Sequence, residues 1–517
     1  MTSLLLVRKF TADYARNGVN LLVLVLVPVV FVVVAAPSLA DTARLLGGTG
    51  TPVATETVTA GWTAGFLAAV AMYFQVAGAR GADARLVLSG LPTARLAIGR
   101  MLTGFLLALV ASAAALLALL ARTGIHDPVR VIAGTVMFAV IYLAIGAVVG
   151  AGVPSPVNGT VLILFIWILD VFFGPAMSAA DRVATRWMPT HFVSLWMVDL
   201  PSRHGGRIGD PGWALMWTLG AVGVAFAVVS AAVGVRRHSR GRRSPGSASD
   251  QLAAALRGGW RDVRRNPVLW VLLAAVPTVF IVLAQATTPH GSTPIVLTEG
   301  GRQFTALFDP ARIHGATMAP IAVASLATLA GLFLVLDARS GDHRLVLAGL
   351  RVRVVLAARL TLVALAALVA AGVSLAVTAT VFNARQWAVY AAGLLLVAVT
   401  YGMIGVLLGP ILGRVGGVFI AFLAPFLDLG IGQSPMLRGL PPTWAQYLPG
   451  YGGIRVLLDG ALTTDFDQTR ALLIALAWLA ALTLTAGWLL HRGVRSTVAT
   501  EPPTARPADR PAQLTPA

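Results

Sequence analysis

Two stretches of the chain carry the same pattern and decide its architecture. Residues 13–31 read D-Y-A-R-N-G-V-N-L-L-V-L-V-L-V-P-V-V-F, and residues 262–280 read D-V-R-R-N-P-V-L-W-V-L-L-A-A-V-P-T-V-F. Both contain D-x-x-R-N-x-V followed by P-x-x-F at the same spacing, and both lead into an apolar run. A pattern that recurs in the same order indicates two copies of one structural unit.

The composition requires a lipid bilayer as the solvent. Of the 517 residues, 57% are hydrophobic and only 12% are charged, and the mean hydropathy is +0.81. Soluble domains contain about 25% charged residues. A helix needs about 20 apolar residues to cross the roughly 30 Å of hydrocarbon. Twelve stretches come close to this requirement: 19–36, 61–79, 101–121, 131–151, 157–175, 212–235, 268–286, 317–336, 360–382, 387–409, 415–431 and 468–490.

These observations predict an all-α polytopic membrane protein with about 12 transmembrane helices, arranged as two parallel six-helix repeats. We expect the first half at residues 1–236, a basic cytoplasmic linker at 237–252, the second half at 253–491 and a disordered cytoplasmic tail at 492–517. The offset between the copies increases in the outer segment at 287–316. The extra residues are expected there because loops accept insertions and helices do not.

The net charge of +18 is explained by topology. With both termini inside, most of the 39 Lys and Arg residues fall in cytoplasmic segments, as the positive-inside rule requires. The Arg-rich linker then contacts anionic lipid headgroups, and we expect no nucleic-acid partner. The prediction is a multi-pass protein of the cell (plasma or inner) membrane with both termini in the cytoplasm.

The closest match between the copies lies in the polar segment that follows the second span. In the first copy this segment includes Asp83, the run R-L-V-L at 85–88, G-L at 90–91 and Arg100, and the second copy repeats all of them from Asp342 to Arg359. Apolar residues alternate with arginines here, and they are Leu86, Val87, Leu88, Leu91, Leu96 and Ile98. This predicts a helix with an apolar face for a partner and a basic face for lipid headgroups.

The run R-L-V-L-S-G-L-P-T-A-R-L-A-I-G-R-M-L at 85–102 resembles the stretch after the second helix in permeases of type-2 ATP-binding-cassette (ABC) exporters. The order of elements is also similar. That family has an N-terminal interfacial helix, six spans, a coupling helix that docks on the ATPase, and short re-entrant helices between spans five and six. The segments 4–16 and 252–265 correspond to the interfacial helix, although a simple juxtamembrane anchor explains them equally well. Residues 175–202 and 432–458 correspond to the re-entrant helices.

The resemblance implies that each half contacts one ATPase subunit through a coupling segment. The residues implied are Arg85, Leu86, Leu88, Gly90 and Leu91 in the first half, and Arg344, Leu345, Leu347, Gly349 and Leu350 in the second. The second copy departs from the first where Arg351 and Arg353 replace Pro92 and Thr93. Because both halves are fused, one chain is expected to form the whole pathway.

The resemblance further implies ATP-driven export of a small lipophilic or amphipathic compound, such as a drug or an antibiotic, powered by two copies of a separate ATPase. A phosphate-binding loop requires G-x-x-x-x-G-K-[ST]. Lys9 is the single lysine and stands in R-K-F-T without the glycines. We therefore expect no cofactor in this chain, and ATP and magnesium on the partner. The eight histidines are scattered and no cysteine occurs, so the sequence predicts neither a metal site nor an enzyme.

Two carboxylates lie inside predicted spans. Asp170 and Asp428 occupy matching places in the fifth span of each half, just before Gly174 and Gly432. Ionisable residues at such depth are candidates for a function in the pathway. An aspartate can equally satisfy backbone donors where a helix breaks. Both interpretations remain open at this point.

Aromatic and polar side chains of spans two and five are candidates for lining a pathway, because the exporter family lines its pathway with these spans. They are Phe66, Tyr73, Phe74, Gln75, Phe165 and Trp167. The alternative for each is ordinary packing or contact with lipid.

A proton-coupled multidrug antiporter with twelve helices is the alternative function, since it would also show a parallel repeat. Such a protein would be expected to carry a loop like G-x-x-x-D-R-x-G-R-R between spans two and three. The loop here reads A-R-G-A-D-A-R-L-V-L-S-G-L at 79–91. It shares an Asp and an Arg with that motif but lacks its basic ending.

Overall fold

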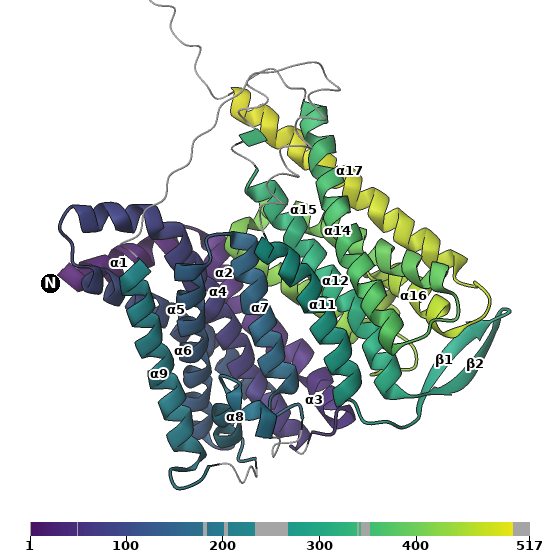
Figure 1. Ribbon diagram of the computed structural model, residues 1–517, viewed down its shortest axis with the longest axis horizontal. Coiled ribbons are helices and arrows are strands. Elements are labelled where there is room, and N and C mark those ends of the chain that lie inside the picture. Colours follow the sequence, from purple (N-terminus) through teal and green to yellow (C-terminus); the bar gives the residue numbers. More distant parts are fainter. Residues whose placement is uncertain are drawn as a thin grey trace, which may run out of the picture.

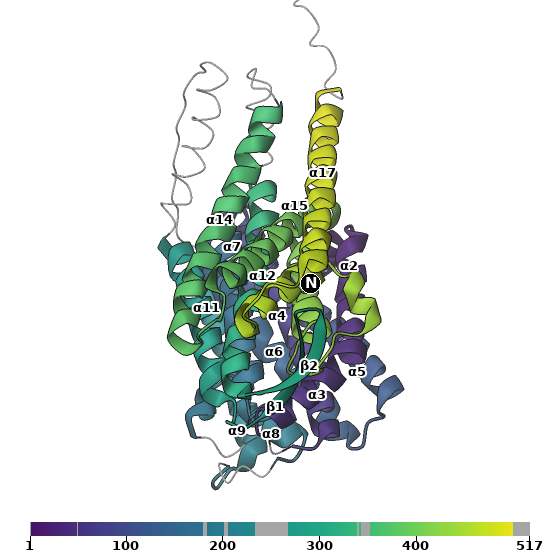
Figure 2. The same cartoon turned by 90° about the vertical axis from the view of Figure 1, so that its right-hand side faces the viewer.

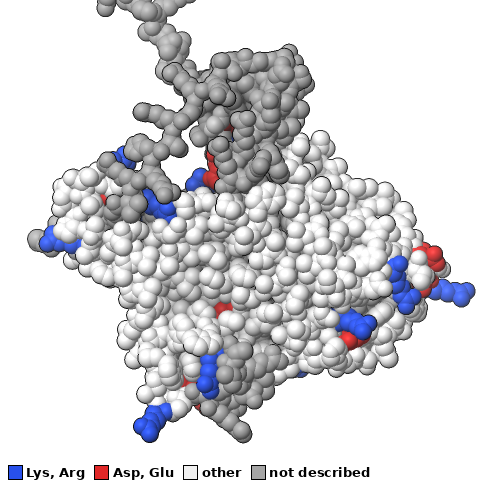
Figure 3. All heavy atoms as spheres, viewed as in Figure 1, with Lys and Arg blue, Asp and Glu red and all other residues white. Residues whose placement is uncertain are grey.

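The computed structural model describes residues 2–48, 50–178, 183–200, 205–232, 267–338, 341–342 and 352–499. Within these residues, eleven helices are long and apolar enough to cross a membrane. The prediction of an all-α polytopic membrane protein is therefore confirmed. The face drawn in Figure 3 agrees, because a wide uncharged area lies between charged residues at the edges of the molecule.

The first half is a bundle of near-parallel helices, at the left of Figure 1. Its elements are α1 (Thr2–Ala15), α2 (Gly18–Val30), the π-helical turn η1 (Phe31–Ala35), α3 (Ala36–Leu45), α4 (Pro52–Leu88), α5 (Thr93–Arg122), α6 (Pro128–Gly152), α7 (Pro156–Phe173), the short 3-10 helix η2 (Val183–Trp187), α8 (His191–Met197) and α9 (Gly209–Ala232).

The second half lies beside it. Its elements are α11 (Pro267–Thr287), β1 (Thr293–Glu299), β2 (Arg302–Phe308), α12 (Pro310–Leu336), α14 (Val352–Val381), α15 (Trp387–Pro425), the π-helical turn η3 (Phe426–Gly432), the 3-10 helix η4 (Thr443–Tyr447), α16 (Tyr451–Leu462) and α17 (Thr469–Ala499). Helices α14 and α17 extend beyond the rest of the bundle on the side away from the strands (Figure 2).

The number of candidate spans differs from the prediction at one place. The predicted spans 387–409 and 415–431 fall in one continuous element, whose two helical parts meet at Gly413. This glycine has φ 67° and ψ −164°, a conformation that an L-residue with a Cβ avoids. The chain therefore changes direction at a single residue, whereas residues 153–155 separate α6 from α7 in the first half.

A β-hairpin was not predicted. Strands β1 and β2 pair antiparallel within the outer segment where the second copy is longer, with Glu299 opposite Arg302. Gly300 and Gly301 both have positive φ, which is what a two-residue type I′ turn requires. The Glu299 carboxylate accepts hydrogen bonds from the side chain and backbone N–H of Thr464, and these bonds lower the pKa of Glu299. The hairpin is thereby attached to the loop between α16 and α17.

An aromatic cluster fills the contact between the two halves. The rings of Phe31, Phe66 and Trp167 from the first half meet those of Phe419, Phe422 and Phe426 from the second, with centroids 4.9–6.0 Å apart in the contacts that cross the interface. These side chains are all buried. We call this set the interface cluster.

Candidate functional site

The end of α4 forms a turn at residues 85–91, where the resemblance implies the first coupling segment. We call it the first coupling turn, and its counterpart in the second half is the second coupling turn. Gly90 has φ 94°, and its N–H donates to the Val87 carbonyl oxygen at 3.0 Å, while the Leu91 N–H donates to the Leu86 carbonyl oxygen at 3.0 Å. These two bonds define a Schellman helix end, which needs a residue that tolerates positive φ. Leu88 in the last turn is 67% exposed, so an apolar side chain points away from the protein.

One part of the expected apolar face is wrong. Leu96 follows the same alternation as Leu88, yet it is only 1% exposed. It belongs to α5, which packs against α1 and α4. The face available to a partner is therefore limited to the turn around Leu88 and to the exposed Ile98.

An ion pair holds this turn in place. Asp83 on α4 accepts two hydrogen bonds from the Arg100 guanidinium on α5, at 2.8 and 3.3 Å, and the two side chains are 9% and 11% exposed. The Arg100 guanidinium carbon also lies 3.7 Å from the ring centroid of Phe10 on α1. Arg100 therefore connects the N-terminal helix, the coupling turn and the third span.

The second half contains the same ion pair. Asp342 accepts from Arg359, with a shortest distance of 2.6 Å. The other predicted residues of this segment lie outside the described residues: Arg344, Leu345, Leu347, Gly349 and Leu350. The linker 237–252 and residues 500–517 also lie outside them, and α17 continues to Ala499, past the boundary predicted at 491.

The two intramembrane aspartates occupy matching hydrogen-bond networks. Asp170 accepts from the Tyr142 hydroxyl at 2.7 Å and from the Thr190 hydroxyl at 2.6 Å. Asp428 accepts from the Tyr401 hydroxyl at 2.6 Å and from the Gly450 N–H at 2.7 Å. Each carboxylate thus joins the fourth and fifth spans to the segment that precedes the sixth.

Both aspartates are buried, at 3% and 4% exposure, and neither lines a described cavity. This geometry favours the structural interpretation over the pathway interpretation. A buried carboxylate is stable when donors surround it, and side-chain and backbone groups of the protein supply such donors here.

None of the predicted pathway residues of span two lines a described cavity. The Tyr73 hydroxyl donates to the Ser155 carbonyl oxygen at 2.9 Å, and Phe74 packs edge-on against Tyr73. The Gln75 amide atoms are buried without a hydrogen-bond partner among the described residues. Phe66 and the span-five residue Trp167 belong to the interface cluster. Phe165 is the one predicted aromatic residue that lines a described cavity.

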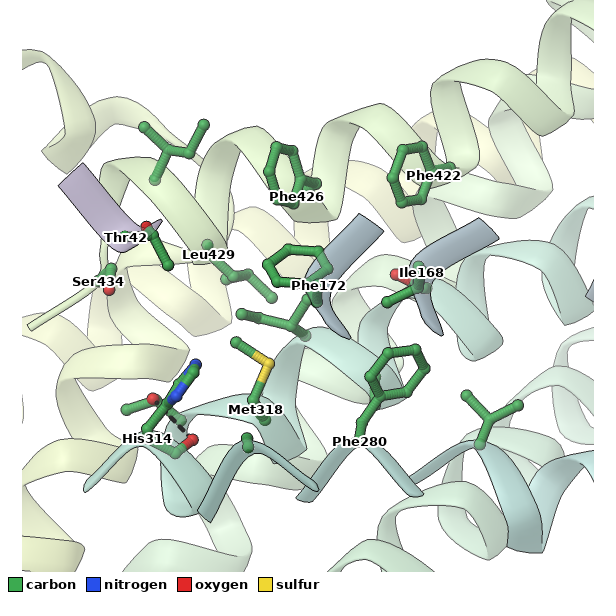
Figure 4. A pocket seen from close by; sticks show the side chains of 18 of the residues that line it. Thr42, Ile168, Phe172, Phe280, His314, Met318, Phe422, Phe426, Leu429 and Ser434 are labelled. Carbon is green, nitrogen blue, oxygen red and sulfur yellow. Dashed lines mark hydrogen bonds between the residues drawn. The ribbon is translucent and has the colours of Figure 1, made fainter. Parts of the chain in front are cut away.

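The cavity at Phe165 lies between the two halves and has a volume of about 80 Å³. It is enclosed by α3 and α7 of the first half and by α11, α12 and η3 of the second, toward the predicted outer side. Figure 4 shows Phe172, Phe280, Phe422 and Phe426 around it, with the His314 imidazole pointing inward. We call it the outer cavity.

A second cavity of about 260 Å³ follows the same boundary toward the predicted inner side. It is lined by α7, α11, α12 and α14, and it shares Val161 and Leu326 with the outer cavity. Asp337 and Arg359 lie at its inner end. We call it the inner cavity.

The sequence did not identify the residues that line these cavities on α11 and α12. One signal was present, because His314 is an ionisable residue at the edge of an apolar segment. It was missed because the predicted span began at 317, whereas α12 begins at Pro310 and buries His314 to 6% exposure.

One sequence match between the copies, in the segment before the sixth span, does not carry over into structure. Asp199 and Asp459 hold matching places in the two copies. Asp199 is exposed and pairs with Arg130 at 2.8 Å. Asp459 is buried and accepts from the Thr463 hydroxyl and the Asp467 N–H, and its burial raises its pKa. The outer segments of the halves are therefore built differently.

A model of a known protein family matches part of the chain. Residues 64–235 match the family model of ABC-2 family transporter proteins. The match begins inside α4, contains the first coupling turn with Asp83 and Arg100, and ends with the first half. The chain matches no curated protein. The family match supports an ABC-2 type permease, a membrane subunit that has no catalytic activity of its own and works with an ATP-binding-cassette ATPase.

Proposed function

We propose that this chain is the permease of an ABC exporter in which two fused six-helix halves form the whole pathway for a lipophilic or amphipathic compound. The observation that carries this proposal is the family match over the first half, which contains the coupling turn. The same match does not favour the proton-coupled antiporter. Two copies of a separate ATPase would hydrolyse ATP with magnesium, one beneath each half.

The duplication is supported by contacts that neither copy's sequence specifies alone. Asp83 pairs with Arg100 as Asp342 pairs with Arg359. Tyr142 donates to Asp170 as Tyr401 donates to Asp428. Helices in lipid associate through packing and internal hydrogen bonds, so equal contacts at equal places support equal folds.

The pathway in this proposal follows the boundary between the halves. The outer and inner cavities lie end to end along α7, α11 and α12, and the two shared residues, Val161 and Leu326, stand between them. Their lining is mostly apolar, which suits a lipophilic compound. The interface cluster closes the neighbouring contact between α4, α7 and α15. Movement of the halves relative to each other would join the cavities in turn to either side.

Energy would enter at the coupling turn. An exposed leucine on a rigid, capped helix end is suited to insert into a groove of a partner protein. The Asp83–Arg100 pair ties this turn to α5 and, through Phe10, to α1. A force applied by the ATPase at Leu88 would therefore move α1, α4 and α5 together. Both termini and both coupling turns would face the cytoplasm in this arrangement.

Replacement of Leu88 by Asp is expected to release the ATPase. The substitution removes a buried apolar side chain from the contact and forces a carboxylate to lose its water. Recovery of the ATPase with the tagged permease should therefore fall at least about tenfold. Val129 is the matched control, since it is 74% exposed at the start of α6 on the opposite side. Val129→Asp should leave recovery unchanged. Undiminished recovery with Leu88→Asp would remove the first coupling turn from the interface, and proton-driven transport by the isolated chain would favour the antiporter instead.

A further inference from the structure

The outer cavity contains one polar group that the transport proposal leaves unexplained, the imidazole of His314. We propose that this cavity binds an uncharged, mainly apolar ligand with at least one hydrogen-bond donor, and that Nε2 of His314 accepts that hydrogen bond. The inference rests on the proposed function, because it names the substrate class of the same pathway.

The charge of the ligand follows from the lining. Among the described residues that line the outer cavity there is no Asp, Glu, Lys or Arg. A charge buried without a partner is strongly disfavoured. An anion or a cation would find no counter-charge here, so the cavity suits a neutral molecule. The same reason favours the neutral form of the His314 ring.

The tautomer of His314 follows from Thr288. The Thr288 hydroxyl oxygen lies 2.6 Å from the Ala284 carbonyl oxygen and 2.7 Å from His314 Nδ1. A hydroxyl has one proton, and a carbonyl oxygen can only accept. Thr288 therefore donates to Ala284 and accepts from the Nδ1–H of His314. In the neutral ring this leaves Nε2 with its lone pair free to accept.

The three threonine hydroxyl groups of the lining also act as donors to their own helices. Thr42 donates to the Ser38 carbonyl oxygen at 2.7 Å, and Thr317 donates to the His314 carbonyl oxygen at 3.2 Å. Thr287 donates to the Leu283 carbonyl oxygen at 2.8 Å. These protons are committed to the helices, so the three hydroxyls can offer only acceptor lone pairs to a ligand. A ligand that satisfies Nε2 of His314 must bring the donor.

The site is not duplicated. At the offset that relates the coupling segments, the first-half residue matching His314 is Thr55 on α4. Its hydroxyl donates to the Ala176 carbonyl oxygen at 3.3 Å and is buried. The first half thus has a threonine where the second half has the imidazole, and we expect one ligand per chain.

Binding of small probes to the purified full-length chain in nanodiscs, without the ATPase, tests the inference. The probes have one ring and similar sizes: phenol, which has a hydroxyl donor, benzene, which has none, and the cation N-methylpyridinium. His314→Leu should weaken phenol about 5- to 10-fold, the usual effect of one lost hydrogen bond, and leave benzene unchanged. His314→Gln keeps an acceptor and should restore phenol to within about twofold of the parent. Thr55→Val is the matched control and should change neither affinity.

Three outcomes would overturn the inference. Unchanged phenol affinity in His314→Leu would place the probe elsewhere, and an equal loss for both neutral probes would reduce His314 to a role in cavity shape. N-methylpyridinium that competes with phenol at similar affinity would refute the neutral class. If His314→Leu fails to fold, Met318→Phe replaces it, since filling the cavity should weaken both neutral probes. The binding experiment contains no ATPase, so its result does not depend on whether the chain transports with ATP. Recovery of the ATPase, in turn, does not depend on the outer cavity, so the two proposals can fail separately.

Discussion

Replacement of Asp428 by Leu is expected to abolish most of the folded protein. The variant removes the acceptor for the Tyr401 hydroxyl, the Gly450 N–H and the Gln433 side-chain amide, which lie 2.6, 2.7 and 3.3 Å from the carboxylate. Each buried donor left without a partner costs about 1–3 kcal/mol. The sum is a large part of the roughly 5–15 kcal/mol that stabilises a typical folded protein.

The measurement is the yield of monodisperse protein and its melting temperature in detergent. Tyr401→Phe removes only one of the three bonds and should cost about 1 kcal/mol, so it should fold and melt slightly lower. Asp170→Leu should behave like Asp428→Leu, because Asp170 holds Tyr142 and Thr190 in the same way. A variant that melts at the normal temperature but has lost transport would instead indicate that the aspartates function in the transport pathway.

Replacement of Arg100 by Leu is expected to destabilise the coupling turn and to uncouple the permease from its ATPase. Removing one member of a buried ion pair leaves Asp83 without compensation, which costs about 3–5 kcal/mol in such settings. The contact with the Phe10 ring is lost as well. We expect a lower melting temperature and loss of substrate-stimulated ATP hydrolysis in the reconstituted complex.

Arg95 supplies the matched control, because it lies on α5 like Arg100 but its side chain is exposed. Arg95→Leu should change the melting temperature little. The double variant Asp83→Leu with Arg100→Leu should be less destabilised than the sum of the single variants, since no unpaired charge remains. Arg359→Leu should reproduce the effect in the second half, and an absence of any effect there would mean that the two coupling turns contribute unequally.

The helices were largely predictable because the signal for a membrane span is local. A run of about 20 apolar residues identifies a span wherever it occurs. The hairpin was missed although Gly300-Gly301 between alternating residues is a hairpin signal. The sequence analysis predicts only a loop with extra residues at this place. The single break at Gly413 was also missed, because one glycine cannot be distinguished by composition from those that pack helices.

The candidate sites were predictable in part. The repeat identified Asp83, Arg100, Asp170 and Asp428 as residues that occur in both copies, yet it did not show that the first two pair with each other. The aromatic residues of span two were expected at a pathway, but Tyr73 and Phe74 pack against each other and Phe66 packs in the interface cluster. In their place α11 and α12 of the second half line the cavities, with His314 as the polar group.

The sequence alone determined that the chain is a membrane protein, approximately where its helices lie and which residues recur in the two halves. These properties depend on the length of apolar runs and on neighbours along the chain. Tertiary structure alone decided which helices meet, which aspartates are enclosed by donors and where the cavities remain. Lipid is as apolar as the helices themselves, so hydrophobicity does not choose their partners. Shape complementarity and buried hydrogen bonds between distant segments do so, and these exist only once the halves are packed.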